Sequence, residues 1–249
     1  MTSTSAVEEG SRSAPNTVVI FHGYTGSPDG FRDVAKRIAR ELNAHVTVPL
    51  LPGHGITLDD LQKVSFDDFI TAARDKLSTV AHEEKPLVII GYCFGGYLAT
   101  LLAKEFQPRI LVIALTPLSA RFPLNIPGIE SFLKLRSTWS KFLRPDEIEM
   151  RKGLFYYPRV PGRAQSLINK GIANMQKVLP HLKMPIITLH TTDDPTGLPE
   201  SGQQMLDLSG QNPKNVAFVL PNRRHALFFG PRKSQDIEIL IESLKKILA

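Results

Sequence analysis

Three kinds of side chain in this sequence could together perform nucleophilic chemistry. Cys93 is the only cysteine, Asp193 and Asp194 are adjacent carboxylates, and His225 lies near the C-terminus. A thiol becomes a strong nucleophile when an imidazole takes its proton, and the imidazole needs a carboxylate to orient it. Each group follows a short aliphatic run that predicts a buried strand. The sequence therefore predicts a nucleophile, an acid and a base at the ends of three strands.

The stretch around Cys93 is typical of a sharp turn between a strand and a helix. Residues 86–90 are rich in Val, Ile and Leu and predict a buried strand, and residues 94–106 predict a helix. Gly91 and Gly95 leave room for a strained backbone that exposes the thiol. The start of a helix also favours a negative charge on the sulfur. Taken alone, these residues equally fit a buried cysteine in a glycine-rich turn of the kind that phosphate-binding folds use.

Apolar runs alternate with helical patterns along most of the chain. The predicted strands span residues 17–21, 45–49, 86–90, 110–115, 186–190 and 216–220. Ser27, and Ser65 with Asp68, are expected to cap two of the helices. Alternating strands and helices indicate a parallel sheet with helices on both faces. We therefore expect an α/β fold with a doubly wound, mostly parallel sheet of about six strands, whose carboxyl ends bring Cys93 and His225 to one edge.

The alternation stops at residues 117–183, which contain no strand run but many Pro, Arg and aromatic residues. Because this insertion follows the carboxyl end of a strand, it is expected to form a cap over the site. The sheet core would then comprise residues 17–116 and 184–249. Residues 1–16 are rich in Ser, Thr and Glu and are expected to form a flexible N-terminal tail.

Several side chains are candidates for contact with a substrate. His22 and His54 lie in turns that follow the first two predicted strands, and Trp139 lies in the predicted cap. Further aromatic candidates for the apolar underside of this cap are Phe142, Phe155 and Tyr156.

Composition excludes some classes of protein. With one cysteine the chain forms no internal disulfide, and the N-terminus lacks the pattern of a secretory signal, so a cytoplasmic location is expected. No apolar run approaches the roughly 20 residues of a membrane-spanning helix. The net charge of +6 is spread along the chain without aromatic interleaving or a nucleic-acid-binding motif. It favours a basic surface that could attract anionic substrates or a membrane face.

The turns after the strands carry a family resemblance. The segments that carry it are 22–28, 52–55, 91–95, 189–194 and His225. Together and in this order they resemble the α/β-hydrolase superfamily over nearly all of residues 18–248. Within it the chain resembles small bacterial carboxylesterases and monoacylglycerol lipases. The cysteine in the nucleophile turn resembles that of dienelactone hydrolases and polyhydroxyalkanoate synthases, since serine is usual elsewhere.

This resemblance implies roles for particular residues. It assigns Cys93, Asp194 and His225 to a catalytic triad, and the spacing after Asp194 favours it over Asp193, which stays an alternative. It also places the backbone N–H groups of Tyr24 and Phe94 in an oxyanion hole. Phe94 is expected there independently, because the first helical residue has an N–H without an intrahelical acceptor. The chemistry needs neither a metal nor an organic cofactor.

The expected function is hydrolysis of a small carboxylic ester, lactone or thioester through an acyl-enzyme on Cys93. A thiolate is expelled more readily than an alkoxide, so esters with good leaving groups should react best. Cys93 is either a natural thiol nucleophile or the replacement of a serine in an ordinary esterase. Two alternatives are an acyltransferase that uses the same thioester and a sensor that binds a ligand without turnover.

Overall fold

A computed structural model describes residues 4–81, 85–119, 128, 131, 138–140, 148 and 151–249, with only the backbone of residues 139 and 140. Its centre is a seven-stranded sheet in the order β1-β3-β2-β4-β5-β8-β9. The strands are β1 (Val7–Glu9), β2 (Asn16–Phe21), β3 (Ala44–Val48), β4 (Leu87–Tyr92), β5 (Ile110–Ala114), β8 (Ile186–Thr191) and β9 (Val216–Leu220). All neighbours pair in parallel except β1 with β3. This confirms the predicted doubly wound, mostly parallel sheet.

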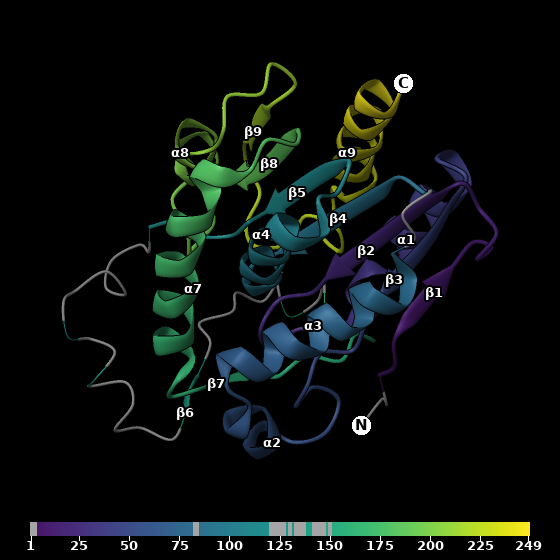
Figure 1. Cartoon of the computed structure of the whole chain (residues 1–249). Coiled ribbons are helices and arrows are strands. Elements are labelled where there is room, and N and C mark those ends of the chain that lie inside the picture. The colour runs from purple at the N-terminus through teal and green to yellow at the C-terminus, as the bar shows by residue number, and fades with distance from the viewer. Residues whose placement is uncertain are drawn as a thin grey trace.

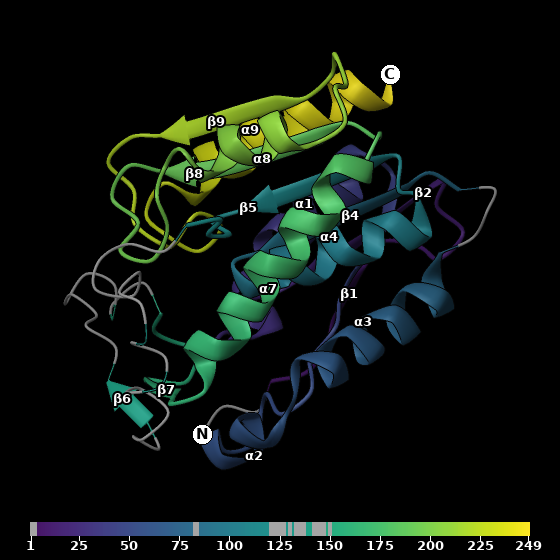
Figure 2. The same cartoon turned by 60° about the vertical axis from the view of Figure 1, so that its left-hand side comes forward.

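Helices cover both faces of the sheet (Figure 1, Figure 2). The helices of the described chain are η1 (Pro28–Phe31), α1 (Arg32–Glu41), α2 (Leu58–Lys63), α3 (Phe66–Val80), α4 (Phe94–Phe106), α7 (Ala164–Val178), η2 (Leu179–His181), α8 (Ser201–Leu208) and α9 (Lys233–Leu248). Two groups of buried apolar side chains result. One joins the sheet to α3, α4, α7 and α8, and the other joins it to α1 and α9.

The first strand corrects the prediction of a flexible tail over residues 1–16. Residues Val7–Glu9 pair with β3, and Val7 is buried. The Glu8 carboxylate accepts hydrogen bonds from Nε2 of His45 at 2.6 Å, Oγ1 of Thr47 at 3.0 Å and Nζ of Lys76 at 2.9 Å. These partners lie far along the chain, so local sequence gives no sign of them.

Helix α7 lies inside the range 117–183 that the sequence assigns to a cap, yet it packs against α4. Leu167, Gly171 and Met175 recur at a spacing of four and are buried. A β-carbon on Gly171 would lie 2.6 Å from the ring of Tyr97, so the two helices approach closely. The helix is therefore part of the core layer. The rest of the predicted cap includes a short hairpin of β6 (Thr138–Ser140) and β7 (Arg159–Pro161), and β7 lies against α2.

Of the two predicted helix N-caps, one is confirmed and one is not. Ser65 and Asp68 form the expected capping box at the start of α3. Ser27 precedes a 3-10 turn instead of an α-helix, and its hydroxyl donates to the carbonyl of Phe155 at 2.8 Å. Its oxygen accepts no capping bond from the backbone N–H groups of this turn.

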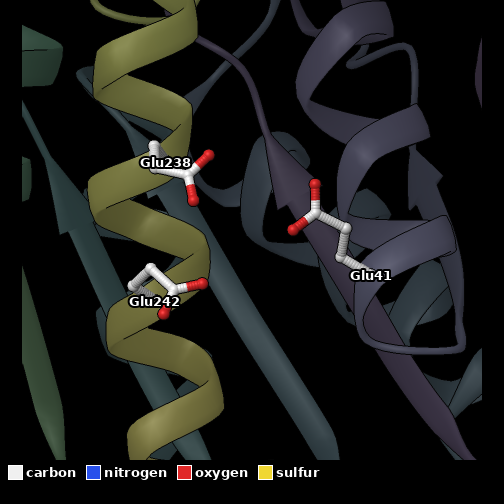
Figure 3. Close-up of side chains that lie close together, drawn as sticks. All are labelled: Glu41, Glu238 and Glu242. Carbon is white, nitrogen blue, oxygen red and sulfur yellow. The ribbon is translucent and has the colours of Figure 1, made fainter.

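An acidic cluster joins α1 and α9 on the face away from α4. Glu41, Glu238 and Glu242 point toward one another (Figure 3). Arg37 pairs with Glu41 at 2.9 Å and also with Glu238, and Lys245 pairs with Glu41 and Glu242 at 3.1 and 2.9 Å. Hydrogen bonds from Arg37 and Lys245 lower the pKa of Glu41 to about 2. Arg40 also pairs with Glu41 at 3.2 Å, so three cations offset the three carboxylates and ion pairs link the two helices.

Among the described residues, no helix combines the length and apolar character needed to cross a membrane.

Candidate active site

Cys93 occupies a strained turn between β4 and α4, as the sequence predicts. Its backbone angles are φ 53° and ψ −117°, in a region that L-residues rarely adopt. Its N–H donates to the carbonyl of Ala114 at 2.8 Å. Its carbonyl accepts from the N–H of Gly96 at 3.0 Å and from Oγ1 of Thr116 at 2.8 Å. These three bonds hold the turn, and the half-buried sulfur is presented at the start of the helix.

The glycines beside Cys93 are required by close packing. A β-carbon on Gly95 would lie 2.1 Å from the carbonyl oxygen of Phe21, and one on Gly91 would lie 2.4 Å from the Cα of Gly96. Both obstacles are backbone atoms that cannot move aside. The first turn of α4 therefore lies directly on β2 and β4, and this contact fixes the position of Cys93.

Of the two adjacent acids, Asp194 reaches the predicted base. Its Oδ2 lies 2.8 Å from Nδ1 of His225. The other oxygen, Oδ1, accepts from the N–H and Oγ1 of Thr196 at 2.8 and 2.6 Å. Asp194 is 2% exposed. Asp193 is exposed, and its side chain accepts from the hydroxyl of Thr192 at 2.9 Å. The structure thus brings His225 together with Asp194.

The charges of this pair are mutually stabilised. Burial alone would lower the pKa of His225, but the Asp194 carboxylate and the Cys93 sulfur favour the cation and raise it to about 10. Burial would raise the pKa of Asp194, but His225 and hydrogen bonds from Thr196 outweigh it and lower the pKa to about 2. At neutral pH the site therefore holds an imidazolium between a carboxylate and the sulfur.

The pair makes a pH-dependent contribution to stability. The folded-state pKa of His225 lies above its unfolded value, so its contribution is complete below about pH 6.5 and is lost as the pH rises toward about 10. The folded-state pKa of Asp194 lies below its unfolded value, so its contribution is complete above about pH 4 and is lost as the pH falls toward about 2. We expect urea unfolding to show a free energy that falls between pH 6.5 and 10, with a smaller fall in Asp194→Asn.

The matched control for this measurement is Asp193→Asn, which removes an equal charge from the neighbouring, exposed residue. It should keep the wild-type slope. Equal slopes in the wild type and in Asp194→Asn would contradict the assignment of this pH dependence to the pair.

The turn at residues 22–26, here called the Gly23 turn, lies against Cys93. A β-carbon on Gly23 would lie 3.3 Å from Cβ and 3.8 Å from Sγ of Cys93. The carbonyl of Gly23 accepts from Nδ1 of His22 at 2.9 Å and from the N–H of Gly26 at 3.1 Å. Because the peptide group is planar and trans, fixing this carbonyl also fixes the direction of the N–H of Tyr24.

The two histidines predicted to contact a substrate do not face one. His22 and His54 are 0% and 2% exposed. Burial lowers the pKa of His22 well below its ordinary value, and the neutral ring accepts at Nε2 from the N–H of Leu51 at 3.2 Å. Nε2 of His54 lies at hydrogen-bond distance from the carbonyl of Tyr24. Their substrate-binding assignment is therefore corrected: both rings hold the backbone of the Gly23 turn.

The predicted cap residues are placed only in part. Trp139 lies in β6 opposite Val160, but its side chain is outside the described residues, as is the whole of Phe142. Phe155 and Tyr156 belong to the segment 151–157, which is bonded to the Gly23 turn. The N–H of Tyr157 donates to the carbonyl of Thr25 at 2.9 Å.

Two residues of the site were missed by sequence reasoning. Thr116 holds the carbonyl of Cys93, and Thr196 holds Asp194. A hydroxyl directly after a strand at the same sheet edge was the available signal for Thr116. Thr196 stands two residues after Asp194, a spacing at which an aspartate commonly accepts from the backbone of its own turn.

A parallel sheet with a strained residue before a helix and a histidine–carboxylate pair at the same edge is the framework of nucleophilic α/β enzymes. The chain belongs to the alpha/beta hydrolase family, whose model matches residues 18–234. The predicted superfamily is thereby confirmed.

The chain is also similar to individual lipases in sequence or in fold. The thermostable monoacylglycerol lipase of Bacillus sp. (strain H-257) is 24% identical over 188 residues, which cover 72% of this chain and 71% of the lipase. The crystal structure of Paleococcus ferrophilus monoacylglycerol lipase superposes with a TM-score of 0.77 at 14% identity, over 97% of this chain and 98% of that one. A structure from work on LipS and LipT, two metagenome-derived lipolytic enzymes, gives 0.79 at 19% identity over 98% of both chains.

Proposed function

We propose that this protein is a carboxylic ester hydrolase that acts through a covalent acyl-enzyme on Cys93. The observation that carries the proposal is the 2.8 Å contact between His225 and the buried Asp194, near a sulfur held in a strained turn. A ligand-binding sensor has no need of a charged pair aligned on a nucleophile. The similarity to monoacylglycerol lipases and lipolytic enzymes supports a small carboxylic ester as substrate.

Attack on the ester begins from the thiolate of Cys93, which adds to the carbonyl carbon. The negative charge on the carbonyl oxygen is received by the N–H groups of Tyr24 and Phe94, the first fixed by His22 and the second at the start of α4. The C–O bond then breaks. The imidazolium of His225 gives its proton to the departing alkoxide, and an acyl thioester remains on Cys93.

Hydrolysis of the thioester returns the site to its starting state. Neutral His225 takes a proton from water, and the hydroxide that forms attacks the thioester carbonyl. The C–S bond breaks, the acid leaves, and the thiolate and imidazolium are restored. Asp194 keeps the ring in one orientation throughout. We also propose that the protein works in the cytoplasm, where a catalytic thiol stays reduced.

The direct test is a screen of nitrophenyl and thiol esters of varied acyl length, with intact-mass spectrometry after rapid acid quenching. We expect release of free acid and a transient mass increase equal to one acyl group. Because Cys93 is the only cysteine, peptide mapping distinguishes a thioester there from acylation of another residue. Failure of every activated ester, with labelling of Cys93 by iodoacetamide no faster than that of a free thiol, would contradict the proposal.

A further inference from the structure

Arg151 is a half-buried cationic side chain that the proposed reaction does not use. Its guanidinium carbon lies 5.0 Å from the ring centroid of Phe229 and 5.4 Å from that of Tyr156. Its Nε is buried and has no hydrogen-bond partner within the described ranges of the chain. In the described part of the chain, no carboxylate forms an ion pair with it. The stacked rings orient the guanidinium, and its Nε donor is unmatched among the residues that the structure describes.

The position of Arg151 relates it to both sides of the candidate site. The segment 151–157 is held to the Gly23 turn by the bond from Tyr157 to Thr25, and to the residue after that turn by the bond from Ser27 to Phe155. Phe229, on which Arg151 stacks, lies four residues after His225. Arg151 therefore contacts the segment that carries the base, and it belongs to a segment that is bonded to the turn beside Cys93.

A chain of ring contacts connects Arg151 to the base. The ring centroid of Phe229 is 6.1 Å from that of Tyr92, which is 5.5 Å from that of His225. The charge of Arg151 also reaches Tyr92: burial raises the pKa of Tyr92 well above its ordinary value, and Arg151 opposes this rise. The guanidinium is thus within electrostatic range of Tyr92, the ring that packs against His225.

The unmatched donor of Arg151 is suited to bind an anion. Arginine offers five donors in a fixed fork and no acceptor, a geometry that matches a carboxylate. A buried donor of a charged group is costly when it is left unpaired. Stacking on aromatic rings holds the side chain in place without using its N–H groups. The net charge of +6 would also favour the approach of an anionic substrate.

We propose that Arg151 binds a carboxylate on the substrate, so that the enzyme favours esters that carry a free carboxylate near the scissile bond, such as monoesters of dicarboxylic acids. The identity of the ligand as an ester substrate rests on the proposed function. The proposed anion subsite is formed by Arg151 where it stacks on Phe229 and Tyr156, and alkylation of Cys93 tests it without turnover.

The test compares alkylation of Cys93 by a charged probe and its neutral counterpart. The probes are 3-maleimidopropionate and 6-maleimidohexanoate, each with its primary amide, and the two chain lengths report the reach of the subsite. We expect the ratio of acid to amide rate constants for one length to exceed that of a small free thiol by about tenfold. Arg151→Met should reduce this ratio to the free-thiol value, and Arg151→Lys should keep part of it.

Arg159→Met is the matched control, since it removes the same charged group from an exposed position on β7. It should keep the wild-type ratio, and the wild-type ratio should fall at high salt. Equal ratios in the wild type and Arg151→Met would overturn the proposal. Should Arg151→Met fail to fold, a wild-type ratio that equals the free-thiol value or is insensitive to salt would overturn it as well.

Ester kinetics separate this inference from the proposed function. The pair is mono-4-nitrophenyl adipate and 4-nitrophenyl 6-methylheptanoate, which differ in a terminal carboxylate or isopropyl group. If both esters are hydrolysed and the ratio of their kcat/KM values is the same in the wild type and Arg151→Met, the anion subsite is contradicted and the hydrolase function is supported. If the alkylation ratio depends on Arg151 but no ester is cleaved, the anion subsite is supported and the hydrolase function is contradicted.

Discussion

Replacing Cys93 with alanine is expected to lower kcat for an activated ester by roughly 10⁴- to 10⁶-fold, because the variant lacks the proposed nucleophile. The turn itself should persist, since it is held by backbone bonds to Ala114 and Gly96 and by the hydroxyl of Thr116. Initial rates with 4-nitrophenyl butyrate measure the loss. Circular dichroism and thermal unfolding verify that the variant is folded.

Cys93→Ser is the informative companion to this variant. A serine hydroxyl must lose its proton to a neutral imidazole, whereas the carboxylate of Asp194 favours the imidazolium form of His225. We therefore expect the serine variant to be less active than the wild type. A large gain of activity would contradict a site adapted to a thiol and would indicate the machinery of a serine esterase. Wild-type activity in Cys93→Ala would exclude Cys93 as the nucleophile.

The elements that the sequence predicts best are those that depend on short-range patterns. The bounds of α4 and β9 agree with the predicted ranges, because an apolar period and flanking turn residues define each of them locally. The predicted edge of the sheet follows from chain order alone. This edge was sufficient to predict that Cys93, Asp194 and His225 lie in the same region of the fold.

The features that the sequence did not predict depend on contacts between distant residues. β1 has only three residues and two of them are glutamates, so nothing local marks it as a strand. It is held by bonds from Glu8 to β3 and α3. His22 and His54 are candidates for substrate contact in the sequence because they lie in turns that follow predicted strands. Both rings are buried, and their nitrogens bond to backbone carbonyls that only the folded turn brings close.

Asparagine variants of the two adjacent acids should differ in activity more than any other matched pair in this chain. Asp194→Asn is expected to lower kcat by about 10⁴-fold, because the amide neither supports the imidazolium nor fixes the tautomer of His225. The removed carboxylate is a major cause of the raised pKa of His225, so the alkaline limit of any remaining activity should move from about pH 10 toward lower pH. The measurement is the pH profile of kcat/KM for both variants.

Asp193→Asn is the control that gives this comparison its meaning. Its carboxylate is exposed and is bonded to Thr192, so the variant should keep a rate within about twofold of the wild type and an unchanged alkaline limit. Since the two variants remove the same charge from neighbouring residues, a general electrostatic effect would lower both rates alike. A loss confined to Asp193→Asn would reverse the assignment of the acid. A loss confined to Asp194→Asn, with a shifted pH limit, would tie the activity to the 2.8 Å contact with His225.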